Sequence, residues 1–200
     1  MNSATQRASV AGPAGLIECA IDAPPDVRGV AVLCHPHPQH GGTMDNKVVQ
    51  TMARAFVQFG YRAVRFNFRG IGASQGGWDE GHGEIDDALA AIGAYREAGL
   101  PLAIGGFSFG GYVASQAAAR LADVERLVLI APAVTNFSMA PVPQSSVVIH
   151  GEVDDVVPLA AVFDWARPQP LPVTVIPGAG HFFHGQLALL KTLIVGGLHR

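Results

Sequence analysis

A serine flanked by two glycine pairs is the first residue of this chain that could do chemistry. Residues 105–111 read GGFSFGG, and residues 106–110 fit the pattern G-x-S-x-G. In that pattern a sharp turn from a strand into a helix exposes the serine hydroxyl, and the glycines relieve crowding where strand and helix nearly touch. Ser108 is therefore the candidate nucleophile for attack on a carbonyl carbon.

Two later segments contain groups that could activate this serine. A serine hydroxyl is a weak nucleophile, and it needs a general base that a third group holds in place. The segment HGEVDDVVP follows an apolar run and contains Asp154 and Asp155, and the segment PGAGHFFH follows another and contains His181 and His184. The glycines before His181 favour it as the accessible base, and we expect His184 at the surface or at the start of the last helix.

Apolar runs that alternate with amphipathic stretches would have to position these residues. The expected strands are 16–21 at an edge of the sheet, 29–34, 61–68, the run that begins at 102, 126–131, 146–150 and 173–176. The expected helices are 46–59, capped by Asp45, then 84–98, 110–121, 159–166 and 186–198. This alternation predicts an α/β fold with a mostly parallel central sheet and helices on both faces, whose ligand site lies beyond the carboxyl ends of the strands.

Composition places the chain among ordinary globular proteins, and its length favours one domain. It has 200 residues, of which 49% are hydrophobic and 14% charged, with a formal net charge of −3. No run of lysines or arginines offers the basic patch that nucleic acid or an anionic membrane would need. Residues 1–14 read as a loose lead-in without the apolar core of a secretory signal, so we expect a cytoplasmic protein in which Cys19 and Cys34 are reduced.

Five segments, in this order, resemble the α/β-hydrolase superfamily, and most closely its small lidless bacterial serine hydrolases. They are HPHPQHGGTMDNK from residue 35, NFRGIGAS from residue 67, the Ser108 turn, HGEVDDVVP and the pair Gly180-His181. The chain order serine, aspartate, histidine is also that of the superfamily. The resemblance implies that Asp154 is the acid, because it takes the aspartate position of H-G-x-x-D-x-x-V-P, with Asp155 as the alternative.

The resemblance also implies an oxyanion hole made of two backbone amides. The first is the amide of Phe109, the residue after the nucleophile. The second should come from the HPHP segment, in which Pro36 and Pro38 have no N–H to donate. His37 is then the expected donor, and it matches the position that the family uses, with Gln39 as the alternative.

The histidines of the HPHP segment could instead suggest a metal site. His35 and His37 each precede a proline, which stiffens the loop without requiring a ligand, and no carboxylate follows until Asp45. We expect that these imidazoles and that of His40 pin the loop through hydrogen bonds. His150 closes a strand and is likewise expected to be structural.

The connection between the strand after the nucleophile helix and the strand before the acid is too short to hold a lid. About a dozen residues, 134–145, lie there, so the pocket should be shallow and roofed by loop side chains. The expected lining residues are Met44, Trp78, Phe109, Phe137, Met139 and Phe182. A tight glycine turn with an exposed arginine explains Asn67 and Arg69 without a catalytic role.

These observations predict a carboxylesterase-like serine hydrolase of small acyl esters that needs no cofactor. Thioesters, lactones and amides remain alternatives, because the same triad serves all of them. A noncatalytic ligand-binding protein with this fold and metal-assisted hydrolysis are alternatives of other classes. The expected partner is a small molecule, with neither nucleic acid nor membrane, and the protein is expected to be a monomer or a small homo-oligomer.

Overall fold

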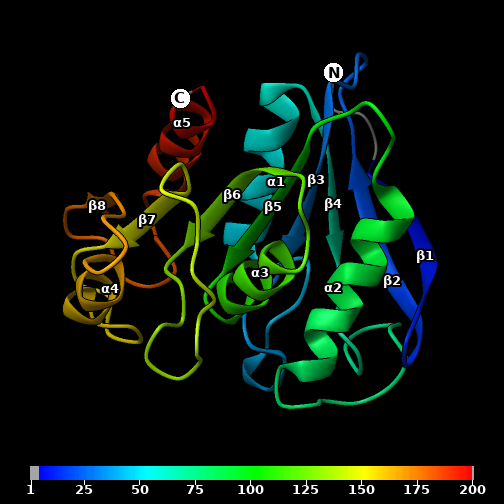
Figure 1. The fold of residues 1–200 in the computed structure, drawn as a ribbon, viewed down its shortest axis with the longest axis horizontal. Coiled ribbons are helices and arrows are strands. Elements are labelled where there is room, and N and C mark those ends of the chain that lie inside the picture. Colours follow the sequence, from blue (N-terminus) through cyan, green and yellow to red (C-terminus); the bar gives the residue numbers. More distant parts are fainter. Residues whose placement is uncertain (1–4, 200) are drawn as a thin grey trace.

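A mostly parallel sheet forms the centre of the molecule (Figure 1). The structure, a computed structural model, describes residues 5–199. Within them eight strands follow the order β1-β2-β4-β3-β5-β6-β7-β8. The strands are β1 (Gln6–Gly12), β2 (Gly15–Asp22), β3 (Gly29–Cys34), β4 (Tyr61–Phe66), β5 (Leu102–Phe107), β6 (Val124–Ile130), β7 (Val147–Gly151) and β8 (Val173–Ile176). β2 pairs antiparallel with β1 and β4, and the other neighbours are parallel, so the predicted sheet is confirmed.

Helices cover both faces of this sheet (Figure 1). The helices are α1 (Lys47–Phe59), α2 (His82–Tyr95), α3 (Phe109–Ala119), α4 (Leu159–Ala166) and α5 (Leu187–Leu198), with one 3-10 turn, η1 (Pro38–His40). Buried residues of α1 and α5 form one apolar cluster with the sheet, and those of α2, α3 and α4 form the other. The core therefore consists of two layers, one on each face.

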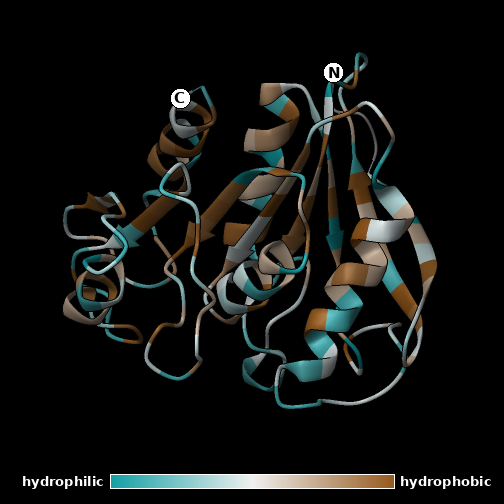
Figure 2. Ribbon diagram, viewed as in Figure 1, coloured by the Kyte–Doolittle hydropathy of each residue, from teal (hydrophilic) through white to brown (hydrophobic). Residues whose placement is uncertain are grey.

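The two strands in the middle of the sheet position the candidate nucleophile. β3 and β5 are parallel neighbours, and every residue of both is buried, as expected for strands covered on two faces. Figure 2 shows the strands in this region largely in hydrophobic colours. Cys34 pairs with Gly106, so the HPHP segment that follows β3 and the turn that follows β5 emerge side by side.

The amino-terminal segment departs from the expectation. Residues 6–12, predicted as part of a loose lead-in, form β1, and β2 is consequently not the edge strand; residues 1–4 lie outside the described part. The turn between Gly12 and Gly15 closes this hairpin. β1 is mostly exposed on one side, and its polar, small residues suit a solvated edge strand but carry little apolar pattern.

Several helix ends also differ from the predicted boundaries. Asn46, not Asp45, caps α1, because its side chain accepts a hydrogen bond from the Val48 amide while the Asp45 carboxylate binds arginines. α2 begins at His82 instead of 84 and ends at Tyr95 instead of 98. The Glu84 carboxylate accepts the Gly81 amide and so stabilises the earlier start.

No helix or strand interrupts the connection between β6 and β7. Residues 131–146 form turns and irregular loop, which agrees with the predicted absence of a lid. Cys19 and Cys34 are both free and buried, as predicted. Among residues 5–199, none of the helices has the length and apolar character needed to cross a membrane.

Candidate active site

Ser108 lies on the turn between β5 and α3, in a strained backbone conformation. Its φ of 55° and ψ of −117° are values that residues other than glycine rarely adopt. Three backbone hydrogen bonds hold this turn: the Ser108 amide donates to Ile130, and the Ser108 carbonyl accepts from Gly111 and Ala133. The strained turn is thus held by the end of β6, the residues that follow it and the start of α3.

The glycines around Ser108 are required by space. A β-carbon at Gly106 would overlap the carbonyl of Gly110, and one at Gly110 would overlap the carbonyl of Cys34. The β5–α3 turn and the end of β3 are therefore packed backbone against backbone. This packing confirms the predicted reason for the G-x-S-x-G pattern, since any side chain at either position would push α3 away from the sheet.

His181 and Asp154 form a buried pair beyond the carboxyl ends of β7 and β8. His181 Nδ1 lies 2.7 Å from Asp154 Oδ2, and the two side chains are 3% and 0% exposed. The other carboxylate oxygen accepts the amides of Val156 and Val157 at 2.9 and 2.8 Å. The structure thus places Asp154 on the histidine, whereas Asp155 is exposed.

Asp154 is held in its ionised form. Burial by itself would raise the pKa of Asp154, but the hydrogen bond from His181, the Val157 amide and the nearby histidines outweigh burial and lower that pKa below its ordinary value. An ionised carboxylate can only accept hydrogen bonds, so His181 Nδ1 carries the proton that lies between them. In the neutral imidazole, Nε2 is then free to accept a proton.

Ser108 and His181 lie at the same end of the sheet without a direct hydrogen bond. The Phe107 ring, next to Ser108 in the chain, lies 5.0 Å from the His181 ring. No hydrogen bond joins Ser108 Oγ to His181 in the part of the chain that the structure describes. Such contacts are often long in unliganded sites and shorten when substrate binds.

The two predicted oxyanion donors lie on adjoining backbone segments. Phe109 is the first residue of α3, and neither its amide nor that of His37 has a hydrogen-bond acceptor within residues 5–199. The His37 carbonyl accepts the amides of His40 and Gly42 at 3.1 and 3.0 Å, which closes η1 into a tight turn. The rings of His37 and Phe109 lie 5.1 Å apart. Two N–H groups without acceptors therefore lie on these two adjoining segments, one of them on the residue that follows Ser108.

Hydrogen bonds of the His35 and His37 imidazoles fix the HPHP segment, as predicted, whereas the His40 imidazole contributes a stacking contact. His35 is buried; its Nε2 accepts the Phe68 amide at 3.1 Å, and its Nδ1 lies 2.7 Å from the Pro36 carbonyl. Because a carbonyl can only accept, Nδ1 carries the proton and His35 is neutral. His37 Nδ1 accepts the Gln39 amide, and His40 stacks on His37. No cluster of metal-binding side chains occurs among the described residues.

The neutral state of His35 makes the fold sensitive to acid. Burial lowers the pKa of His35 to about 4 from an ordinary value of 6.5. Below pH 6.5, His35 of the unfolded chain binds a proton, whereas His35 of the folded chain stays neutral. The free energy of unfolding therefore falls as the pH drops toward 4. At about 1.4 kcal/mol per pKa unit, His35 accounts for a loss of about 3 kcal/mol over this range.

We expect His35→Gln to remove most of this dependence, because glutamine keeps an acceptor for the Phe68 amide but does not titrate. Denaturant unfolding at pH 7 and pH 4.5 measures the difference. His184→Gln, at an exposed histidine, is the matched control and should keep the wild-type loss. An equal loss in wild type and His35→Gln would show that His35 is not the group responsible.

His150 contacts the acid, a proximity that the sequence did not reveal. Its Nε2 lies 2.8 Å from the Val157 carbonyl and 3.4 Å from Asp154 Oδ2, and its side chain is fully buried. Burial lowers the pKa of His150, although the Val157 carbonyl and the Asp154 charge oppose this shift. A neutral His150 therefore donates Nε2–H toward the acid loop and supports the position of Asp154.

The predicted pocket residues fall into two groups. Trp78 and Phe137 form an aromatic cluster with His37 and Phe109, in which the ring centroids lie 4.6 to 5.9 Å apart. Phe182 is 43% exposed, and its ring lies 5.1 Å from that of His181. These three side chains border the candidate site.

Two of the predicted pocket residues make their contacts elsewhere. Met44 is only 1% exposed, and its polar contacts are with Arg7, Arg65 and Asn67. Met139 packs against the core, with its sulfur 3.9 Å from Ser115 Oγ. The sequence could not separate these residues from Trp78, because apolar side chains suit a core and a pocket equally.

Asn67 and Arg69 are structural, but Arg69 is not the exposed arginine that we expected. Its guanidinium forms a two-point ion pair with Asp87, at 2.8 and 3.0 Å, and donates to the Gly83 carbonyl. Asn67 accepts the Met44 amide and donates to a carboxylate oxygen of β2. Both side chains fix the loop that follows β4.

Comparisons with known proteins agree with this architecture. Residues 25–176 match the family described as Serine aminopeptidase, S33. The uncharacterized protein RP471 of Rickettsia prowazekii is 36% identical over 171 residues, which cover 77% of this chain and 71% of that protein.

Two solved structures are similar over almost the entire chain. XC6422 from Xanthomonas campestris, described as an α/β serine hydrolase without a lid, is 37% identical with a TM-score of 0.90 and covers 100% of this chain and 96% of its own. An α/β serine hydrolase homologue from Coxiella burnetii is 36% identical with a TM-score of 0.85, covering 99% and 98%. The chain therefore has the α/β-hydrolase fold and belongs to the serine aminopeptidase S33 family.

Proposed function

We propose that this protein is a serine hydrolase that cleaves small acyl esters, with Ser108 as nucleophile, His181 as general base and Asp154 as the acid that orients it. The observation that carries the proposal is the buried His181–Asp154 pair at 2.7 Å, on the same end of the sheet as a serine held in a strained turn. Because the buried, ionised Asp154 carboxylate accepts a hydrogen bond from His181 Nδ1, His181 Nε2 is left without a proton and can act as the base toward Ser108.

The reaction follows from these positions. Ser108 Oγ attacks the ester carbonyl carbon while its proton passes to His181 Nε2, and the carbonyl oxygen becomes an oxyanion. The amides of His37 and Phe109 donate hydrogen bonds to that oxyanion. The intermediate collapses as His181 returns the proton to the leaving alcohol. Water then attacks the acyl-enzyme, its proton passes to His181, and the acid product leaves as Ser108 regains its proton.

An open, partly apolar border favours small acyl groups as substrates. Residues 131–146 form no lid over the site, so little of a substrate can be enclosed. Trp78, Phe137 and Phe182 offer apolar and aromatic surface near the nucleophile. Such surface suits short aliphatic or aryl acyl groups better than charged ones.

A fluorophosphonate probe combined with a substrate panel tests this proposal. The panel contains acyl esters of graded length, the matching thioesters and lactones, and an aminoacyl anilide. We expect one phosphonyl group on Ser108, located by mass spectrometry, and the highest kcat/KM for a short ester. A protein that neither reacts with the probe nor turns over any panel member would be a binding protein instead, and a preference for the anilide would contradict the ester assignment.

A further inference from the structure

The alcohol part of an ester has to lie next to His181, whichever acyl group the protein accepts. In the proposed reaction His181 returns its proton to the alcohol oxygen as the tetrahedral intermediate collapses. The alcohol oxygen then lies within hydrogen-bond reach of His181 Nε2, at about 2.6 to 3.2 Å. The side chains around His181 are therefore the ones that can select the alcohol.

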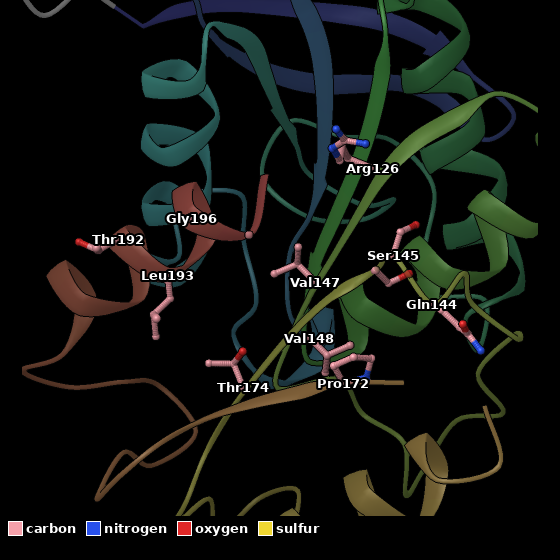
Figure 3. A pocket seen from close by; sticks show the side chains of 12 residues that line it. Arg126, Gln144, Ser145, Val147, Val148, Pro172, Thr174, Thr192, Leu193 and Gly196 are labelled. Carbon is pink, nitrogen blue, oxygen red and sulfur yellow. The ribbon is translucent and has the colours of Figure 1, made fainter. Parts of the chain in front are cut away.

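A cavity of about 530 Å³ is too remote to hold the alcohol during this proton transfer. Figure 3 shows it beside α5, with Val147 of β7, Thr174 of β8 and Leu193 of α5 among its lining residues. Asp154 and His181 follow the other ends of these two strands, and neither lines the cavity. β7 alone separates the two ends by about 13 Å at the usual rise per residue.

Phe182 is an aromatic side chain that contacts the base and is also open to solvent. Its ring packs edge-on against His181, with ring centroids 5.1 Å apart and an angle of 90° between the rings. It packs in the same way against Phe107, at 5.8 Å and 72°. Phe107 is fully buried and precedes Ser108 in the chain, whereas Phe182 is 43% exposed. The Phe182 ring is thus anchored on one side and accessible to a ligand on the other.

Phe182 is separate from the aromatic side chains on the oxyanion side of the site. Those side chains, Trp78 and Phe137, contact the ring of Phe109 at 5.3 and 5.0 Å. Phe107, which contacts Phe182, belongs to the apolar cluster on one face of the sheet, and Phe109 belongs to the cluster on the other face. A substitution at Phe182 can therefore change the surface beside the base and leave the oxyanion side intact.

The loop that carries the acid exposes apolar side chains as well. Val153 and Val156 are 58% and 52% exposed, and with Phe182 they are three of the six large hydrophobic residues that are exposed within residues 5–199. The Val153 amide donates to the Ala179 carbonyl at 3.0 Å, so this loop adjoins the segment that carries the base. Apolar surface is stabilised when hydrocarbon covers it, whereas a polar group loses its own hydration there.

We propose that Phe182 determines the specificity for the alcohol and selects esters whose alcohol part is a hydrocarbon, a specificity that rests on the proposed esterase function. The alcohol chain lies across the exposed side of the Phe182 ring while its oxygen takes the proton from His181 Nε2. Each methylene group that this contact removes from water raises kcat/KM by up to about fourfold, because kcat/KM includes the binding of the free substrate.

Two acetates of nearly equal size test the role of Phe182. Butyl acetate and 2-methoxyethyl acetate differ only in that an ether oxygen of the second replaces a methylene group of the first. We expect the ratio of their kcat/KM values, butyl over methoxyethyl, to fall at least about threefold in Phe182→Ser. Phe182→Leu keeps an apolar side chain and should stay within about twofold of the wild-type ratio. Comparing ratios between variants cancels the different intrinsic reactivities of the two alcohols.

Two controls accompany this measurement. Phe163 of α4 is 39% exposed but lies outside the loops that hold Asp154 and His181, so Phe163→Ser should keep the wild-type ratio. Methyl acetate and methyl butanoate vary the acyl group at a constant alcohol. Their kcat/KM ratio should be the same in wild type and Phe182→Ser.

The outcomes distinguish this specificity from the proposed function. If the wild-type protein hydrolyses none of these esters, the esterase function is wrong and the specificity is wrong with it. If the esters are hydrolysed and the butyl to methoxyethyl ratio is equal in wild type and Phe182→Ser, only the role of Phe182 is overturned. A proportional loss of both acetates in Phe182→Ser would show that the ring merely supports His181, and a change in the acyl ratio instead would place the acyl group there.

Discussion

Replacing Ser108 by alanine is expected to lower kcat/KM for a short acyl ester by about 10⁴ to 10⁶-fold, because no other group at the turn can form the acyl-enzyme. The loss should appear mainly in kcat, since the hydroxyl contributes little to ground-state binding. Ser108 Oγ has no hydrogen bond among the described residues, so the variant should unfold at the wild-type temperature. Steady-state hydrolysis and a thermal melt measure both quantities.

The control for this variant is Ser138→Ala, which removes an exposed hydroxyl from the loop between β6 and β7. It should retain wild-type activity within about twofold, as expected for a surface change away from the reacting atoms. If Ser108→Ala retains a substantial share of the wild-type rate while remaining folded, the nucleophile lies elsewhere and the proposed reaction is wrong.

The second large effect is expected from Asp154→Asn. An asparagine keeps an oxygen that can accept the amides of Val156 and Val157, so the loop should remain folded. Its amide nitrogen, however, would donate toward His181 Nδ1 and favour the tautomer that has its proton on Nε2. His181 could then no longer accept the Ser108 proton, and kcat should fall by about 10⁴-fold.

Asp155→Asn is the matched control, because Asp155 is adjacent in the chain but exposed. It should change kcat by less than about twofold, as surface substitutions usually do. Equal losses in the two variants, or a larger loss in Asp155→Asn, would exchange the roles of the two aspartates. The ester kinetics of both variants at pH 7 decide the question, since the lowered pKa of Asp154 keeps it ionised there.

The sequence by itself determined those features of this protein that depend on residues close together in the chain. The limits of α4 and β8 were predicted to the residue, because an apolar run or stripe ends at a proline or a polar residue within a few positions. The Ser108 turn was predicted because the glycines on both sides of the serine permit the close approach of strand and helix that the pattern G-x-S-x-G requires. Because the strands are parallel, the serine, the aspartate and the histidine that follow three of them were then expected at one end of the sheet.

Tertiary structure decided the features that join distant residues. β1 exists because β2 offers it a partner, and its own sequence carries too little apolar pattern to show this. Arg69 is half-buried instead of exposed because Asp87, 18 residues away, lies opposite it. His150 reaches Asp154 only because the acid loop turns back over the end of β7.

The same limit applies to the candidate active site. Sequence order placed a serine, an acid and a histidine at one end of the sheet, and resemblance chose Asp154 over Asp155. Only the folded chain showed which carboxylate lies 2.7 Å from His181. Local patterns determine backbone shape, whereas the pairing of buried polar groups depends on long-range packing that no single segment encodes.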